Sequence, residues 1–243
     1  MPIFRCRDKL VHYAHVPKCA GSAVNRYLAA RFGPLAFQDE HHTKRGQAER
    51  WTRTSPQHVA HVALARLFPE GFLDASFTIV RHPVARLRSV YAFQIEVERA
   101  VPPETGFSEW LATLPGALEA DPRALDNHIR PMDDIVPEGA HVLHLEDGME
   151  PLVAWLDALE GEARGPREVA PANRRSDRRG GKVTAPPARP TPPDLELVGS
   201  LYARDFERFG YRIDEARPPA RPKAPAGRGG ERSGWLATLL GRG

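Results

Sequence analysis

The stretch that decides the fold reads His15-Val16-Pro17-Lys18-Cys19-Ala20-Gly21-Ser22-Ala23. A short apolar run, residues 10–14, precedes it, and residues 24–32 carry apolar side chains at helical spacing. A strand, a turn with a lysine and small residues, and then a helix form the layout of an anion-binding loop, because the first amide groups of a helix lack intrahelical partners. An ordinary strand-to-helix turn with an exposed lysine gives the same pattern, so the stretch alone leaves both interpretations open.

The composition is that of a globular protein, with 243 residues, 41% of them hydrophobic and 27% charged, and a formal net charge of +3. This length suits one domain with short additions. Two cysteines, Cys6 and Cys19, are too few for a disulfide framework and favour a reducing compartment. Charges interrupt the first ten residues, which excludes a signal peptide, and no apolar run is long enough to span a membrane. We therefore expect a cytoplasmic protein without a transmembrane segment.

A second predicted strand, residues 76–80, is apolar almost throughout, as is typical of a strand buried on both faces of a parallel sheet. It ends in Arg81-His82-Pro83, where the proline suits the first turn of a helix. Ligands of open α/β sheets bind beyond the carboxyl ends of the strands. We expect Arg81, and Ser89 two turns into the helix, to share one crevice with the first loop; a structural ion pair is the alternative for Arg81.

Two histidines, His58 and His61, follow a turn that begins at Ser55-Pro56. A histidine can act as a general base because it titrates near neutral pH. A structural role is the alternative for each of them. As metal ligands they lack further ligands at a recognised spacing, so the sequence predicts no metal site.

The rest of the sequence predicts a third buried strand over residues 140–145, followed by an amphipathic helix. It also predicts a last helix with inward side chains from Leu195 to Phe209 and a terminal strand over residues 211–213. The arginine-rich loop 173–182 either clamps a phosphate-bearing ligand or is simply solvated. Residues 214–243 form a Pro/Arg/Gly-rich tail with the composition of a disordered segment. Its short amphipathic end, residues 235–240, is suited to contact a partner or a membrane surface.

Two sequence signatures carry a family resemblance. Residues 15–23 match H-[IV]-P-K-[TC]-A-G-[TS]-[SA] at every position, and residues 77–91 match F-x-[IV]-[IV]-R-[DH]-P-x-x-R-x-x-S-x-Y. The strand that ends in Glu-Asp at 146–147 and the motif Y-x-x-D-F-x-x-F-G-Y at 202–211 also appear. In this order the motifs resemble those of the sulfotransferases that use 3′-phosphoadenosine-5′-phosphosulfate (PAPS), especially the carbohydrate-directed branch that includes heparan sulfate 2-O-sulfotransferase.

The resemblance implies a three-layer α/β fold like that of P-loop NTPases, with a central, mostly parallel sheet flanked by helices, in a sulfotransferase domain over residues 1–213. It implies PAPS as the sulfuryl donor, no metal, and a hydroxyl-bearing acceptor, above all a carbohydrate. Lys18 would stabilise the leaving group, and a histidine between the two signatures, His58 first and His61 second, would be the base. The implied donor-binding residues are Pro17, Lys18, Cys19, Ala20, Gly21, Ser22, Ala23, Arg81, Ser89, Asn173 and Arg174.

Other classes of protein fit the residues less well. A P-loop kinase or NTPase needs G-x-x-x-x-G-K-[ST], which is absent. A cysteine phosphatase would place a thiolate at Cys19, but Arg26 stands one residue too far for a C-x5-R loop, and we interpret Cys19 as a small lining residue. A non-catalytic nucleotide- or nucleic-acid-binding module is the alternative function, although it does not explain two anion-binding loops at strand ends. We expect no nucleic-acid partner.

Overall fold

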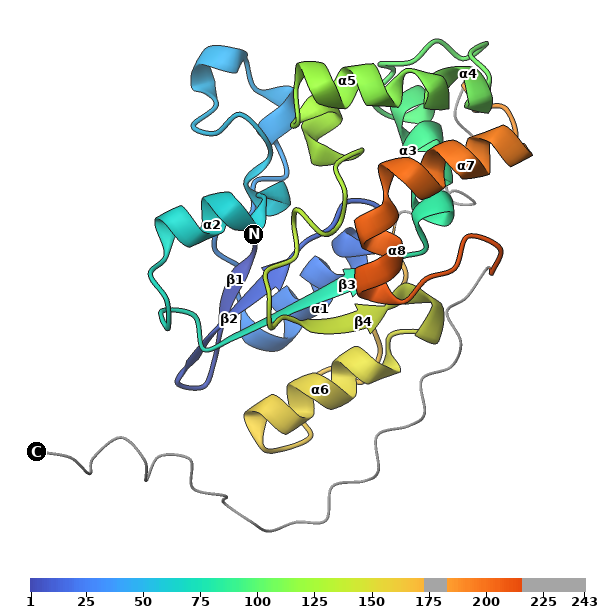
Figure 1. Cartoon of the computed structure of the whole chain (residues 1–243). Helices are drawn as coiled ribbons and strands as arrows, with labels where there is room; N and C mark the ends of the chain where they lie inside the picture. Colours follow the sequence, from blue (N-terminus) through green and yellow to red (C-terminus); the bar gives the residue numbers. More distant parts are fainter. Residues whose placement is uncertain (173–182, 216–243) are drawn as a thin grey trace, which may run out of the picture.

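A four-stranded sheet forms the centre of the computed structural model, which describes residues 1–172 and 183–215. The strand order is β1-β2-β3-β4; the first pair is antiparallel, and the other two pairs are parallel. This arrangement confirms the predicted α/β architecture with a mostly parallel sheet (Figure 1). The strands are β1 (Ile3–Cys6), β2 (Lys9–Ala14), β3 (Ala75–Val80) and β4 (His141–His144).

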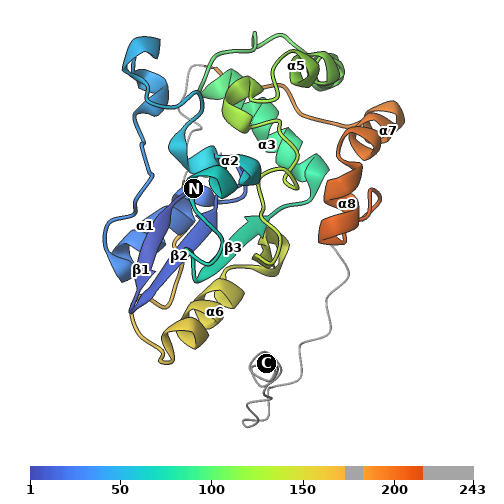
Figure 2. The ribbon, with the colours of Figure 1, turned by 60° about the vertical axis from the view of Figure 1, so that its left-hand side comes forward.

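Each parallel strand leads toward a helix: β2 toward α1, β3 toward α3 and β4 toward α6. Figure 2 shows α3 and α5 above the strands and α6 below them. The α-helices of the described residues are α1 (Gly21–Phe32), α2 (His61–Leu67), α3 (Pro83–Glu96), α4 (Phe107–Ala112), α5 (Leu114–Ala120), α6 (Glu150–Glu160), α7 (Pro192–Leu201) and α8 (Ala203–Phe209). The 3-10 helices are η1 (His42–Lys44), η2 (Gln47–Glu49), η3 (Pro56–His58), η4 (Ala124–Asn127) and η5 (Leu145–Asp147).

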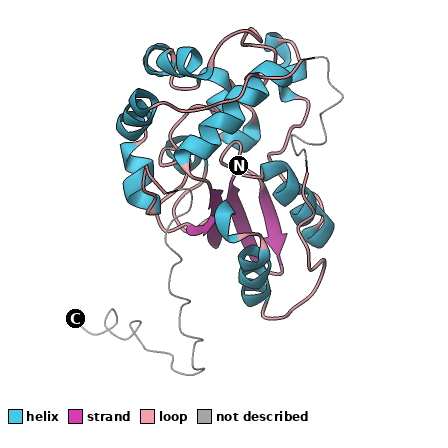
Figure 3. Ribbon diagram, turned by 90° about the vertical axis from the view of Figure 1, so that its right-hand side faces the viewer, coloured by secondary structure: helices cyan, strands magenta, loops and turns pink. Residues whose placement is uncertain are grey.

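Helices cover both faces of the sheet. On one face, Phe32 of α1 stacks on Phe4 of β1 with ring centroids 4.7 Å apart. Trp155 of α6 packs on the same face, 5.1 Å from the ring of Phe77 in β3. On the other face α8 lies against the end of β4 (Figure 1), where Nε2 of His144 is 2.8 Å from the carbonyl oxygen of Phe209. Figure 3 shows helices on both sides of the strands. The contacts of α6 and α8 thus cover β3 and β4, two of the apolar strands that the sequence predicted.

A second apolar cluster joins α3, α4 and α7 beyond the sheet. Tyr91 of α3 packs against Trp110 of α4, with ring centroids 5.5 Å apart, and donates a hydrogen bond of 2.6 Å to the carbonyl of Thr105. Tyr202, which follows α7, donates to the carbonyl of Ile129 at 2.6 Å. The cluster therefore fixes α3 and the segment near residue 129 relative to each other, and both contribute to the site described below.

The C-terminal part of the described chain differs from the prediction in two ways. The last helix is interrupted, because Tyr202 has a non-helical backbone with φ of −115° and ψ of 26°. The predicted terminal strand is wrong: residues 211–213 pair with no strand of the described sheet, and Tyr211 is held instead by a 3.0 Å hydrogen bond to Glu146. Strand β1 was not predicted, since it is short and Arg5 interrupts its apolar residues.

The predictions for the arginine-rich loop 173–182 and for the tail beyond residue 215 lie outside the described residues. Within residues 1–172 and 183–215, none of the helices combines the length and the apolar character that crossing a membrane requires.

Candidate active site

A pocket of about 1410 Å³ lies beyond the carboxyl ends of β2 and β3. Since β2 and β3 are parallel neighbours, the two signatures that follow them reach the same edge of the sheet. The structure thus places on one pocket the two loops that were expected to share a crevice. The predicted site residues that line it are Pro17, Lys18, Ala20, Gly21, Ser22, His58, Arg81 and Ser89.

The loop between β2 and α1 has an unusual backbone. Lys18 and Ala20 both adopt left-handed conformations, with φ of 66° and 63°, which are uncommon for residues other than glycine. Turns of this kind direct neighbouring amide groups toward one side, where they form a concave site for an anion. Ala20 is also the N-cap of α1, and Ser22 is exposed in the first helical turn. The loop therefore has the backbone and the charge of an anion-binding site.

Gly21 allows His15 to pack directly against the start of α1. A Cβ atom at Gly21 would lie only 1.6 Å from Nε2 of His15, so a larger residue has no room there. The His15 ring is buried and stacks on Tyr13, with centroids 5.3 Å apart. Burial, and then the proximity of His58, lower the pKa of His15 well below its ordinary value. His15 is therefore a neutral wall of the pocket at physiological pH.

The two arginines of the second signature, Arg81 and Arg86, have different surroundings. Arg81 lines the pocket, and its Nη1 lies 3.4 Å from the carbonyl oxygen of Lys18, which links the two signatures. Arg86 is fully buried and donates to the carbonyls of His128, at 3.1 Å, and of Arg130. Arg81 is thus placed to meet a ligand, whereas Arg86 anchors the segment that carries His128.

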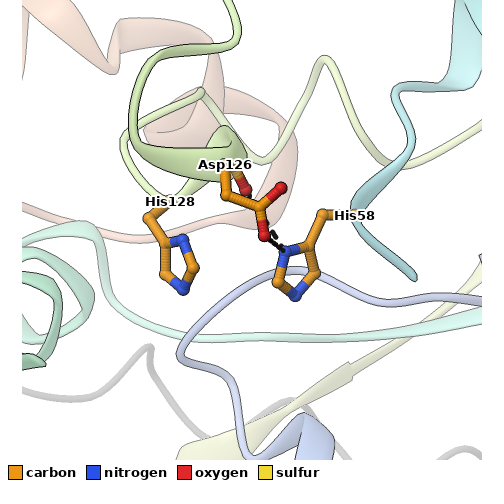
Figure 4. Close-up of side chains that lie close together, drawn as sticks. All are labelled: His58, Asp126 and His128. Carbon is orange, nitrogen blue, oxygen red and sulfur yellow. Dashed lines mark hydrogen bonds and ion pairs between the residues drawn. The ribbon is translucent and has the colours of Figure 1, made fainter. Parts of the chain in front are cut away.

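His58 is held by a carboxylate from a distant part of the chain. Nδ1 of His58 lies 3.0 Å from Oδ2 of Asp126 and 3.2 Å from the carbonyl oxygen of the same residue (Figure 4). Oδ1 of Asp126 accepts a 2.5 Å hydrogen bond from the amide of Ser55. Burial opposes ionisation of Asp126, but the hydrogen bonds from His58 and Ser55 outweigh it and hold the pKa of the carboxyl well below its usual range. Asp126 is therefore a carboxylate.

His128 brings this pair close to the lysine of the first signature. Its Nδ1 lies 2.6 Å from the carbonyl oxygen of Leu125, and its ring stacks on Phe93 with centroids 5.1 Å apart. Nζ of Lys18 lies 3.7 Å from the centroid of the same Phe93 ring, a cation–π contact. Burial, followed by the charges of His58 and Lys18, lowers the pKa of His128 to about 3. His128 is neutral at physiological pH.

One group in the described part of the chain has donor atoms suited to a metal ion. One atom each of His58, Asp126 and His128 lies within 4.8 Å of the other two. Hydrogen bonds explain this arrangement without an ion, because Nδ1 of each histidine already faces an oxygen acceptor. These contacts favour proton transfer over metal binding as the role of the three side chains. That the protein requires no metal stays a prediction.

Two of the predicted donor-binding residues of the first signature lie behind the pocket. Cys19 and Ala23 are buried in the apolar core rather than exposed to the pocket, so Cys19 is not the lining residue that we expected. Burial raises the pKa of the Cys19 thiol to about 12. A thiol that keeps its proton at neutral pH is a poor nucleophile, which argues against a cysteine phosphatase.

The remaining predicted residues stand apart from the pocket. His61 begins α2, does not line the pocket, and donates its amide hydrogen to the carbonyl of Asp134 at 3.0 Å. Asn173 and Arg174 lie outside the described residues. Of the two candidate bases, only His58 therefore contacts the pocket.

Sequence reasoning missed Asp126 and His128. Residues 126–131 appeared polar and loop-like, and the hydrogen bond to His58 spans 68 positions of the chain. The close succession of an acid, an amide and a histidine at 126–128 was the available signal. This pattern could not be interpreted from the sequence, because only the tertiary structure shows that its partner is His58.

A model of the Sulfotransferase family matches residues 1–212 of the chain. The chain belongs to this family. The matched region includes both signatures, the pocket and the His58–Asp126 pair. Neither the curated proteins nor the solved structures give a match. Membership supports sulfuryl transfer as the general chemistry of this sulfotransferase.

Proposed function

We propose that this sulfotransferase transfers the sulfuryl group of PAPS to a hydroxyl group of a carbohydrate or a similar small acceptor. The observation that carries the proposal is the meeting of three elements in one pocket: the loop around Lys18, Arg81 at the end of β3, and the His58–Asp126 pair. The first two suit a donor with separate anionic groups. The third suits the removal of a proton from an alcohol.

The residues of the pocket fit the chemistry of the donor. PAPS supplies a sulfuryl group on its 5′ side and carries a separate phosphate at its 3′ position. The left-handed loop at Lys18 and Ala20 would bind the 5′-phosphosulfate through amide groups and one ammonium group. Arg81 and Ser89, from the second signature, would bind the 3′-phosphate through charged and neutral hydrogen bonds.

Each step of the transfer then has a group to support it. The acceptor oxygen forms a bond to sulfur, the bond from sulfur to the 5′-phosphate oxygen breaks, and 3′,5′-adenosine diphosphate leaves with the electron pair. Lys18 stabilises the charge that grows on the departing oxygen, as preorganised cations do in phosphoryl transfer. Nε2 of His58 accepts the proton of the acceptor hydroxyl. Positioning and fixed charge supply most of the rate enhancement.

Calorimetric titration tests the donor site without a known acceptor. We expect the wild-type protein to bind 3′,5′-adenosine diphosphate at least about tenfold more tightly than 5′-adenosine diphosphate, because the 3′-phosphate adds charged hydrogen bonds. The variant Lys18→Ala should bind the first nucleotide more weakly. The matched control is Arg66→Ala, which removes an exposed cation of α2 that does not line the pocket. Equal affinity of the wild type for both nucleotides would contradict the proposed donor.

A further inference from the structure

We propose that Asp126 is a positioning residue, which holds His58 in the tautomer with its proton on Nδ1 and its lone pair on Nε2. The catalytic consequence of this inference rests on the proposed function. The tautomer itself follows from contacts of the two residues, and it can be measured whether or not the protein transfers sulfuryl groups. Asp126 belongs to neither signature.

The surroundings of Nδ1 determine where the proton of His58 lies. This nitrogen faces the Oδ2 and the carbonyl oxygen of Asp126, at 3.0 and 3.2 Å. A carbonyl oxygen and an ionised carboxylate can only accept hydrogen bonds. Nδ1 must therefore carry the hydrogen, which leaves the lone pair of the neutral ring on Nε2. Figure 4 shows Nε2 on the side of the ring that is turned away from Asp126.

The backbone around Asp126 is held in a strained conformation. Leu125, Asp126 and Asn127 are consecutive left-handed residues, with φ of 53°, 57° and 64°. Such conformations are unfavourable for residues other than glycine, less so where a short polar side chain bonds locally. Nδ2 of Asn127 donates to the carbonyl of His58 at 2.7 Å, so this turn holds both the ring and the backbone of the histidine. Such strain persists where the surrounding contacts fix it, and it is common at functional sites.

Asp126 is also the anionic neighbour that His58 needs after it takes a proton. The rings of His15 and His128 lie edge-on to His58, with centroids 4.9 and 5.2 Å away, and burial keeps both of them neutral. The ammonium group of Lys18 lies over the Phe93 ring on which His128 stacks, and a cation does not stabilise an imidazolium. The amino group of Met1 donates to the Pro56 carbonyl at 2.5 Å, and burial lowers its pKa well below the ordinary value. Of these groups, Asp126 alone stabilises an imidazolium at His58.

The variant Asp126→Asn separates positioning from structure. Its amide can donate to Nδ1 and move the hydrogen to Nε2, where the base then lacks a lone pair. We expect kcat to fall roughly 10²- to 10⁴-fold, while the affinity for 3′,5′-adenosine diphosphate stays within about twofold.

Two further variants make the test specific. Asp126→Glu keeps a carboxylate and should recover part of the lost activity. Asp74→Asn is the matched control, since Asp74 also accepts a backbone amide hydrogen, from Leu10 at 2.7 Å, but is exposed and does not line the pocket. Full activity in Asp126→Asn, with the affinity for 3′,5′-adenosine diphosphate unchanged, would overturn the proposal.

Nitrogen-15 NMR of the histidine rings reads the tautomer directly, with the His58 signal identified by its loss in His58→Gln. The wild type should show hydrogen on Nδ1, and Asp126→Asn should shift the population toward hydrogen on Nε2. Hydrogen on Nε2 in the wild type overturns the proposal even if the protein is active. Conversely, a protein that binds no 3′,5′-adenosine diphosphate contradicts the proposed function, while the NMR result still decides the role of Asp126.

Discussion

The wall of the pocket that carries Lys18 and Arg81 comes from two adjacent strand ends, whereas the wall that carries His58 and Asp126 joins segments 68 positions apart. The first wall, which we call the donor wall, presents cations and a left-handed loop. The second, which we call the proton wall, presents His58, the carboxylate of Asp126 and the buried, neutral imidazole of His128. An enzyme that binds an anionic donor and removes a proton from an acceptor needs both kinds of surface. In this protein the two surfaces come from different segments of the chain.

This separation has a consequence for mutants. Changes in the donor wall should act mainly on nucleotide affinity, and changes in the proton wall should act mainly on kcat. Lys18 is the point where the walls meet, because its ammonium group and His128 pack on the same ring of Phe93. Mutants of Lys18 are therefore expected to affect both quantities.

The largest effect should come from the proton wall. His58→Gln keeps a polar side chain of similar size but removes the base, so we expect the rate of transfer to fall roughly 10²- to 10⁴-fold. Nucleotide affinity should change by less than about twofold, because the proposed donor contacts come from Lys18, Arg81 and Ser89. Single-turnover transfer and calorimetry of the same protein sample measure both quantities. An equal loss of affinity and rate would show that the walls are not separable.

A smaller effect is expected from the donor wall. Arg81→Ala removes a charged hydrogen-bond donor of about 1.5–3 kcal/mol, which corresponds to roughly 10- to 150-fold weaker binding of 3′,5′-adenosine diphosphate. Calorimetry measures the change. Arg86→Met provides the contrast within the same signature: it removes buried hydrogen bonds to His128 and Arg130 and should lower the free energy of unfolding. If both variants weakened binding without changing stability, the distinction between the arginines would be wrong.

The smallest effect should follow removal of metal ions. The contacts of His58, Asp126 and His128 are satisfied as a hydrogen-bonded group, so treatment with a chelator should change the transfer rate by less than about twofold. The assay is the same transfer reaction before and after dialysis against the chelator. A loss that added zinc restores would assign this group to a metal ion and would change the interpretation of the proton wall.

The two walls also differ in how far the sequence predicted them. The donor wall could be predicted locally, since a buried strand, a loop of small residues with a lysine, and a helix are contiguous in the chain. The adjacency of β2 and β3 then brings Arg81 to Lys18. The order of strands within the sheet, and β1 in particular, was not readable in advance.

The proton wall required the tertiary structure. His58 was identified by its place between the signatures, but its carboxylate partner could not be found, because nothing local relates residue 58 to residue 126. The same limit applies to Cys19: its position at a helix start suggested a lining residue, and only the packing of the core shows that it is buried. Local patterns predict which side chains follow a strand end, and packing decides where the others point.

The most direct test of the central claim is transfer from sulfur-35-labelled PAPS to a panel of carbohydrates and other hydroxyl-bearing molecules. We predict that the wild-type protein labels at least one acceptor, releases 3′,5′-adenosine diphosphate in equal amount, and loses this activity in His58→Gln. A protein that binds 3′,5′-adenosine diphosphate tightly but labels no hydroxyl acceptor would contradict the account and would indicate a nucleotide-binding module instead.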